Sequence, residues 1–138
     1  MKNATLILLI LLLFNCKSDD GTPQGDIDLI GEWKLIEQLA DPGDGSGTFL
    51  PIESDKVITF FNDGTVTSNG LLCSMSSEAG TEDTGIYEAI ETSFSYGEIT
   101  PDNCVSNFFN VVYYKIEGAN LILWYQCIES CGFKFEKI

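Results

Sequence analysis

The side chains that could do chemistry in this 138-residue chain are cysteines and carboxylates, because the chain contains no histidine and no arginine. This composition excludes Ser-His-Asp and Cys-His catalysis, histidine metal sites and bidentate arginine recognition of phosphate. Glu88 and Glu98 could form a carboxylate pair, but acid–base catalysis would need them to converge in a deep pocket. A solvated acidic surface is the better interpretation, so we expect no enzymatic activity and no cofactor.

Cys16 follows an apolar amino-terminal segment. After Lys2, residues 4–14 form an apolar run that is shorter than the roughly 20 residues a membrane-spanning helix needs. Residues 1–15 are therefore predicted to be a secretory signal peptide that is removed. Leu13-Phe14-Asn15-Cys16 resembles the lipobox of bacterial lipoproteins. The resemblance implies that the Cys16 thiol receives a diacylglycerol, with palmitate-type acyl chains, and that Cys16 becomes the first mature residue.

Residues 16–26 are predicted to be a flexible tether between the lipid and the fold. Residues 21–25 contain no hydrophobic side chain, so they have nothing to bury. Lys17-Ser18-Asp19-Asp20 is similar to the surface-export signal of certain Gram-negative lipoproteins. This similarity implies an outer-membrane lipoprotein exposed at the cell surface, whose partner through Cys16 is the membrane. Two or three acyl chains would make that attachment stable.

The mature chain is strongly acidic. Removal of residues 1–15 leaves six lysines against 21 carboxylates. Such a surface repels phosphate, so nucleic acid and anionic lipid headgroups are poor partners. Residues 41–47 are acidic and glycine-rich and could wrap a calcium ion, but their spacing does not match an EF-hand. A solvated loop is the favoured interpretation, and no metal is expected.

The remaining four cysteines indicate two disulfides, because an even number in an exported chain is typical of an oxidised framework. They are Cys73, Cys104, Cys127 and Cys131. Three pairings are possible, and we favour Cys73 with Cys104 and Cys127 with Cys131. The longer loop, of about 30 residues, would stabilise the fold by about 3 to 4 kcal/mol. A metal site is disfavoured, because paired Cys-x-x-Cys spacing is missing.

Residues 27–138 are predicted to form one all-β domain. Strand-like segments alternate with turn signals at 31–40, 56–61, 65–69, 84–90, 93–99, 111–117, 120–127 and 132–138. Asn62-Asp63-Gly64 and Gly118-Ala119 are typical of tight hairpin turns. Eight short strands at this spacing favour an antiparallel barrel or sandwich.

Strand register follows from the turns, since a slip of one residue would exchange a strand's two faces. The turn at Gly118-Ala119 places Tyr114 opposite Leu123. If Cys127 and Cys131 close the next hairpin, Leu123 lies opposite Phe135 and Tyr125 opposite Phe133. In the earlier hairpin Phe60 lies opposite Val66. Trp33, Leu35 and Leu39 are expected to share the inner face of the first strand.

A family resemblance enters at the start of this domain. Gly31-Glu32-Trp33, the segment from Phe60 to Thr65 and the terminal Leu-x-Leu hairpin are similar to the lipocalin-like domains of Gram-negative, surface-type lipoproteins. The resemblance implies an eight-stranded up-and-down barrel, closed at one end by Trp33. A lipocalin packs an arginine over this tryptophan, and here only Lys134 or Lys137 could partly replace it. The connection 40–55 would form the lid at the open end.

Two functions follow from this fold, and both stay open. The first is binding of a small hydrophobic ligand inside the barrel, lined by Phe60, Tyr114, Leu123, Tyr125, Phe133 and Phe135. The alternative is a surface structural or interaction protein with a filled barrel, since an eight-stranded barrel can be filled by its own side chains. Its partner face would be the outer side of the late strands, with Val111, Tyr113, Ile122 and Trp124. That face could instead be an aromatic pair covered by a loop or by lysine stems.

Overall fold

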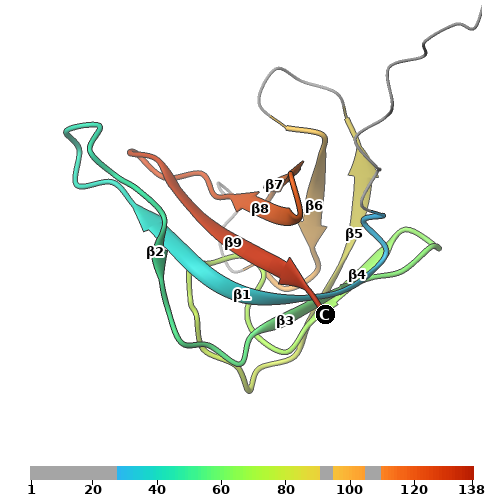
Figure 1. Ribbon diagram of the computed structural model, residues 1–138. Coiled ribbons are helices and arrows are strands. Elements are labelled where there is room, and N and C mark those ends of the chain that lie inside the picture. The colour runs from blue at the N-terminus through green and yellow to red at the C-terminus, as the bar shows by residue number, and fades with distance from the viewer. Residues whose placement is uncertain (1–27, 91–94, 105–109) are drawn as a thin grey trace, which may run out of the picture.

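The alternating segments form an antiparallel β-barrel (Figure 1). The computed structural model describes residues 28–90, 95–104 and 110–138. The segment 1–15 predicted to be a signal peptide, the predicted lipidation site Cys16 and the predicted tether at 16–26 lie outside the described residues. Among the described residues there is no helix long and apolar enough to cross a membrane.

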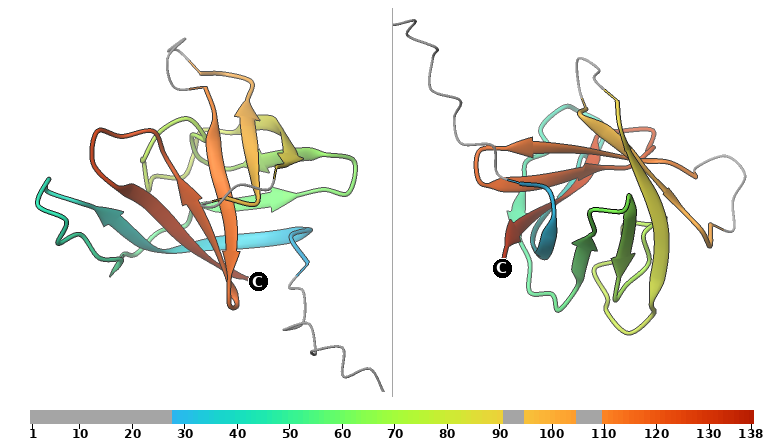
Figure 2. Two further views of the ribbon diagram at one scale, coloured as in Figure 1. Left: turned by 90° about the horizontal axis from the view of Figure 1, so that it is seen from above. Right: turned by 90° about the vertical axis from the view of Figure 1, so that its right-hand side faces the viewer.

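Nine strands are present among the described residues. They are β1 (Gly31–Ala40), β2 (Leu50–Pro51), β3 (Val57–Phe60), β4 (Thr65–Ser68), β5 (Asp83–Ala89), β6 (Gly97–Pro101), β7 (Val112–Glu117), β8 (Asn120–Trp124) and β9 (Cys131–Lys137). Each of β3 to β8 pairs with the next strand along the chain, and β1 pairs with both β3 and β9. These pairings close an eight-stranded barrel, as predicted, while the two-residue β2 extends the edge of β1 (Figure 2).

Most predicted strands are confirmed within a few residues. The segment predicted at 93–99 is displaced, because β6 runs from Gly97 to Pro101. The segment predicted at 120–127 is shorter, because β8 ends at Trp124. The two tight turns form as predicted, with Gly64 and Gly118 at positive φ. Phe60 pairs with Val66, and Tyr114 pairs with Leu123.

The register between β8 and β9 was wrong by two residues. Leu123 lies opposite Phe133 rather than Phe135, and Leu121 lies opposite Phe135. The prediction centred the hairpin on the ring closed by Cys127 and Cys131. In the structure, only Cys131 belongs to a strand. The centre of the hairpin between β8 and β9 lies one residue earlier in the chain than the midpoint between Cys127 and Cys131. A slip of two residues leaves every side chain on its predicted face.

A β-bulge in β1 exchanges the faces of its second half. The pairing with β9 shifts between Leu35 and Glu37, so one extra residue is accommodated there. Trp33 and Leu35 point into the barrel as predicted. Leu39 does not, because it pairs with Gly132 while its neighbour Gln38 pairs with the inward Phe133. Leu39 is still buried, but on the outside of the barrel.

The barrel has two different ends. At the end that we call proximal, the Trp33 indole donates to the Leu29 carbonyl at 2.8 Å, and the Lys137 ammonium lies 5.4 Å from its ring centroid. Lys137 therefore takes the position expected for one of the two lysines. The opposite, distal end carries the connections 41–56, 69–82 and 125–130, together with the described residues 102–104 and 110–111 between β6 and β7. Both predicted disulfides, Cys73–Cys104 and Cys127–Cys131, are present there.

Candidate binding face

The six residues expected to line a ligand cavity lie at the inner face of the barrel, and most of them contact one another directly. Phe60, Tyr114, Leu123, Phe133 and Phe135 are each between 0 and 4% exposed, and Tyr125 is half-buried. The ring centroids of Phe60 and Tyr114 are 5.8 Å apart, and those of Phe133 and Phe135 are 6.2 Å apart, with the rings edge to face. This spacing is that of packed aromatic pairs. The described side chains therefore pack against one another inside the barrel.

The distal end of the barrel is closed by the connection 69–82. Leu72 from this connection is 1% exposed and belongs to the core. The Lys56 side chain is completely buried beneath it, and its ammonium donates to the carbonyls of Leu71 at 2.6 Å and Ser76 at 2.9 Å. The disulfide between Cys73 and Cys104 ties the same connection to the one after β6. The lid predicted at 40–55 is not the element that closes this end.

Burial of Lys56 has an electrostatic cost. Loss of hydration lowers the pKa of its ammonium to about 8, and the buried Asp83 carboxylate opposes part of that change. The Asp83 carboxylate accepts from the Leu72 amide at 2.8 Å. Lys56 and Asp83 thus fasten the closing segment from two sides. We assign both residues to closure of the barrel, since the described residues around them leave neither side chain exposed.

Tyr125 is the one candidate lining residue with unusual chemistry. Its ring packs on Phe133 with centroids 5.6 Å apart. Its hydroxyl is buried, and no hydrogen-bond partner for it exists among the described residues. Burial raises the pKa of this phenol. A hollow of about 200 Å³ adjoins Tyr125 at the distal end, between the two disulfides, and Met75 and Val112 also line it.

The predicted partner face is divided by the connection after β1. Ile122 is only 1% exposed although it points outward from β8. Phe49 packs on the Trp124 ring with centroids 5.7 Å apart, and the Lys134 ammonium lies 4.6 Å from the Phe49 centroid. The connection predicted to be a lid therefore folds over the outer wall instead. It packs against one side of Trp124, and a groove lies between Tyr113, the other side of Trp124 and the loop after β8.

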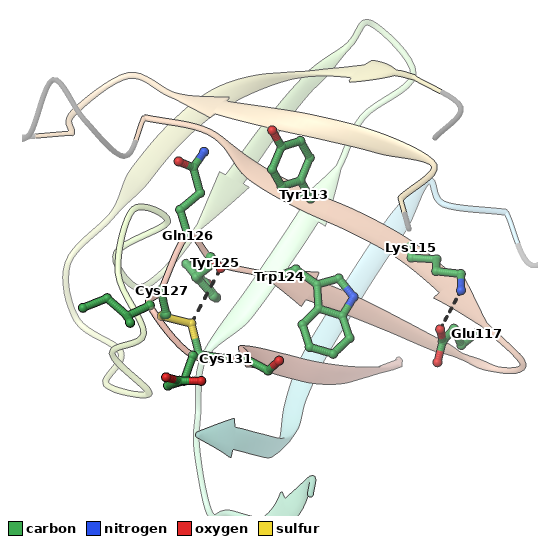
Figure 3. Close-up of a pocket in the computed structure, with 11 residues that line it drawn as sticks. Tyr113, Lys115, Glu117, Trp124, Tyr125, Gln126, Cys127 and Cys131 are labelled. Atoms are coloured by element: carbon green, nitrogen blue, oxygen red, sulfur yellow. Dashed lines mark hydrogen bonds and ion pairs between the residues drawn. A yellow bond between two sulfur atoms is a disulfide. The ribbon is translucent and has the colours of Figure 1, made fainter. Parts of the chain in front are cut away.

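This groove has a volume of about 580 Å³. Tyr113 on β7 and Trp124 on β8 are direct cross-strand partners and form its floor (Figure 3). The loop closed by Cys127 and Cys131 forms its distal rim and carries Ile128, whose side chain is fully exposed at 101%. We call Tyr113, Trp124 and Ile128, with the groove between them, the binding face. Val111 lies beside it, half-buried.

Glu88 and Glu98 continue this face along the sheet. They are direct partners across β5 and β6, and Glu98 is in turn the partner of Tyr113. Both carboxylates point outward, with Glu88 exposed and Glu98 half-buried, so they do not converge in an enclosed pocket.

No family model, curated protein or solved structure matches this chain. The described residues also contain no group of three or more acidic or cysteine side chains placed to hold a metal ion.

Two parts of the binding face could not be found from sequence alone. Ile128 stands between cysteine and glutamate in a polar loop, and nothing in this pattern distinguishes an exposed isoleucine from a buried one. Phe49 follows a glycine-rich segment whose path is not fixed by any strand alternation. In contrast, Tyr113 and Trp124 were brought together correctly by counting residues from the turn at Gly118.

Proposed function

We propose that this protein is an exported lipoprotein, held at the outer membrane through Cys16, whose barrel is a rigid support for binding a protein partner at the cell surface. One observation carries the choice of partner binding over ligand binding. The described interior is filled by its own side chains, while the binding face holds a groove bordered by a fully exposed isoleucine. Exposed apolar surface of this kind marks interaction sites.

The place where the described chain begins supports the same function. The Lys137 ammonium at the end of β9 donates to the carbonyl of Asp28, the first described residue. The strand β9 then runs seven residues back to Cys131, a length of roughly 20 Å at about 3.3 Å per residue. Figure 1 shows the loop before β9 at the side of the molecule away from the C-terminus. A lipid on Cys16 would therefore be attached to the barrel on its proximal side, away from Ile128.

Photo-crosslinking on intact cells tests this proposal. A photoreactive amino acid is placed at Ile128 in the full, lipidated chain and, as a matched control, at Ile138, which is 63% exposed at the proximal end. We expect one discrete crosslinked protein from position 128 and none of the same mass from position 138. Equal crosslinking at both positions, or none at either, would contradict a partner site on the binding face.

A second candidate function is binding of a small apolar molecule with one hydrogen-bonding group. The observation that favours it is the buried Tyr125 hydroxyl without a partner beside the distal hollow, because a buried unsatisfied polar group calls for an explanation such as a bound molecule. The available volume of about 200 Å³ would suit only a molecule of about benzene size or slightly larger.

A further inference from the structure

Four side chains form one continuous row on the outside of the barrel. Glu88 on β5, Glu98 on β6, Tyr113 on β7 and Trp124 on β8 are each the direct cross-strand partner of the next. Neighbouring strands lie about 4.8 Å apart, so the row spans roughly 14 Å. Two carboxylates thus stand at one end of the row and two aromatic rings at the other.

The two carboxylates at one end of this row lower the stability of the sheet. Like charges directly opposite each other destabilise a sheet. The two ion pairs between described residues join Lys115 to Glu117 and Lys134 to Glu37, so neither of these lysines forms an ion pair with Glu88 or Glu98. An external cation beside this pair would remove the repulsion.

The distal end adds further negative charge. The described residues of its connections, at 41–56, 69–82, 102–104, 110–111 and 125–130, include eight acidic residues and one lysine. That lysine is Lys56, which is completely buried. The exposed charge of these connections is therefore negative throughout, including Glu129 on the rim of the groove.

We propose that the binding face, extended by Glu88 and Glu98, takes a cationic amphipathic polypeptide segment, one that alternates lysine or arginine with apolar side chains. This inference rests on the proposed function and names the chemistry of its partner. Cationic groups pair with Glu88 and Glu98 at the carboxylate end of the row. Apolar side chains enter the groove between Trp124 and Ile128.

A second copy of this chain fits the face poorly. Its own surface carries the same excess of carboxylates, so two copies would bring like charges together at the distal end. Charge complementarity also gives the expected signature of the true occupant. Its association should be fast at low ionic strength and should weaken as salt screens the contacts.

Tryptophan accessibility provides the readout. The chain has two tryptophans, of which Trp33 is fully buried and Trp124 is half-buried at the groove. Acrylamide quenching of the full chain with Cys16→Ser therefore reports mainly on Trp124. The probes are three peptides of about 12 residues without tryptophan, composed of lysine and leucine, of glutamate and leucine, and of lysine and serine. The lysine–leucine peptide is expected to protect Trp124, with binding about tenfold weaker when salt rises from about 50 to about 300 mM.

The double variant Glu88→Gln/Glu98→Gln is the decisive change, because it should relieve repulsion and fold at least as stably as the parent. We expect it to bind the lysine–leucine peptide about tenfold more weakly. The matched control Glu32→Gln/Glu136→Gln removes two exposed carboxylates elsewhere and should change binding less than about twofold.

Equal binding of the glutamate–leucine peptide, or unchanged binding by the Glu88→Gln/Glu98→Gln variant, would overturn the cationic preference. So would a Trp124 that stays open to acrylamide with every peptide. None of these results bears on crosslinking at Ile128 in cells, which decides the proposed function separately.

Discussion

Lys56 has the most unusual environment for its side-chain type, because its charged ammonium is completely buried. A buried ammonium loses its hydration, and the two carbonyl acceptors and the nearby Asp83 carboxylate return only part of that free energy. The ammonium also lies 5.1 Å from the Phe133 ring centroid. Lys56 thus fixes the closing segment in one position while lowering the free energy of unfolding at neutral pH.

The stability of the protein should therefore rise with pH above about 8, the pKa of Lys56 in the folded state. Between that pH and the ordinary lysine pKa near 10.5, the folded state has lost a proton that the unfolded state keeps. We expect the free energy of unfolding in urea to gain about 1 to 2 kcal/mol between pH 7.5 and pH 9.5, since one pKa unit corresponds to about 1.4 kcal/mol.

The Lys56→Met variant is the control for this dependence. Methionine has a similar length and no charge, so the rise with pH should disappear while the folded state persists. An equal rise in the parent and in Lys56→Met would show that another group titrates there.

At the scale of the elements, the packing of β6 on β7 depends on a glycine. A methyl group at Gly97 would stand 2.3 Å from the Tyr114 ring and hydroxyl and 2.3 Å from the Glu88 carbonyl. The Tyr114 ring therefore occupies the space that any other residue at 97 would need. This close approach also lets the Tyr114 hydroxyl donate to Glu88 at 3.3 Å.

Gly97→Ala should cost about 2 to 3 kcal/mol in the free energy of unfolding, because backbone must move to admit the methyl group. Gly118→Ala is the matched change. Gly118 has φ 61° but open space around it, so only backbone strain of about 1 kcal/mol is expected. Urea titrations of both variants check the order, and a loss at Gly118 equal to or larger than that at Gly97 would contradict the packing account.

The two disulfides should differ in their contribution. Cys73 and Cys104 are separated by 31 residues and Cys127 and Cys131 by four, and a longer loop restricts the unfolded chain more. Replacing both cysteines by serine should cost about 3 to 4 kcal/mol for the first pair and about 2 kcal/mol for the second. Thermal unfolding of the two double variants measures this order, and the reverse order would show that native-state contacts of the short loop dominate.

The strands also show which parts of the fold could be predicted from the sequence. Alternation and turn residues fixed the faces of β3, β4, β7 and β8, because a glycine turn and an apolar face each set the register independently. The bulge in β1 could not be predicted, since one extra residue leaves the composition of the strand unchanged. The path of residues 41–49 was missed for a related reason. Phe49 is placed by a tertiary contact with Trp124, and local sequence carries no signal for such a contact.

At the scale of the whole molecule, the first described residue, Asp28, lies at the end of the barrel opposite to the loop that carries Ile128. A variant with Cys16→Ser and with residues 1–15 replaced by a signal peptide that is cleaved without lipidation lacks both the thiol that would be acylated and the apolar leader. We expect this variant to move from the membrane pellet to the soluble envelope fraction with its fold unchanged. Fractionation and immunoblotting of parent and variant cells measure this. A variant that stays in the membrane pellet would contradict anchoring through Cys16.

The central claim is that the barrel is filled and acts through its outer surface. Native mass spectrometry of the full Cys16→Ser chain, exported from bacteria and purified without detergent, tests it most directly. We predict the mass of the bare polypeptide with two disulfides under native conditions, identical to its denatured mass. A native mass higher by that of a small apolar molecule, lost on denaturation, would contradict the filled barrel and place the function inside it.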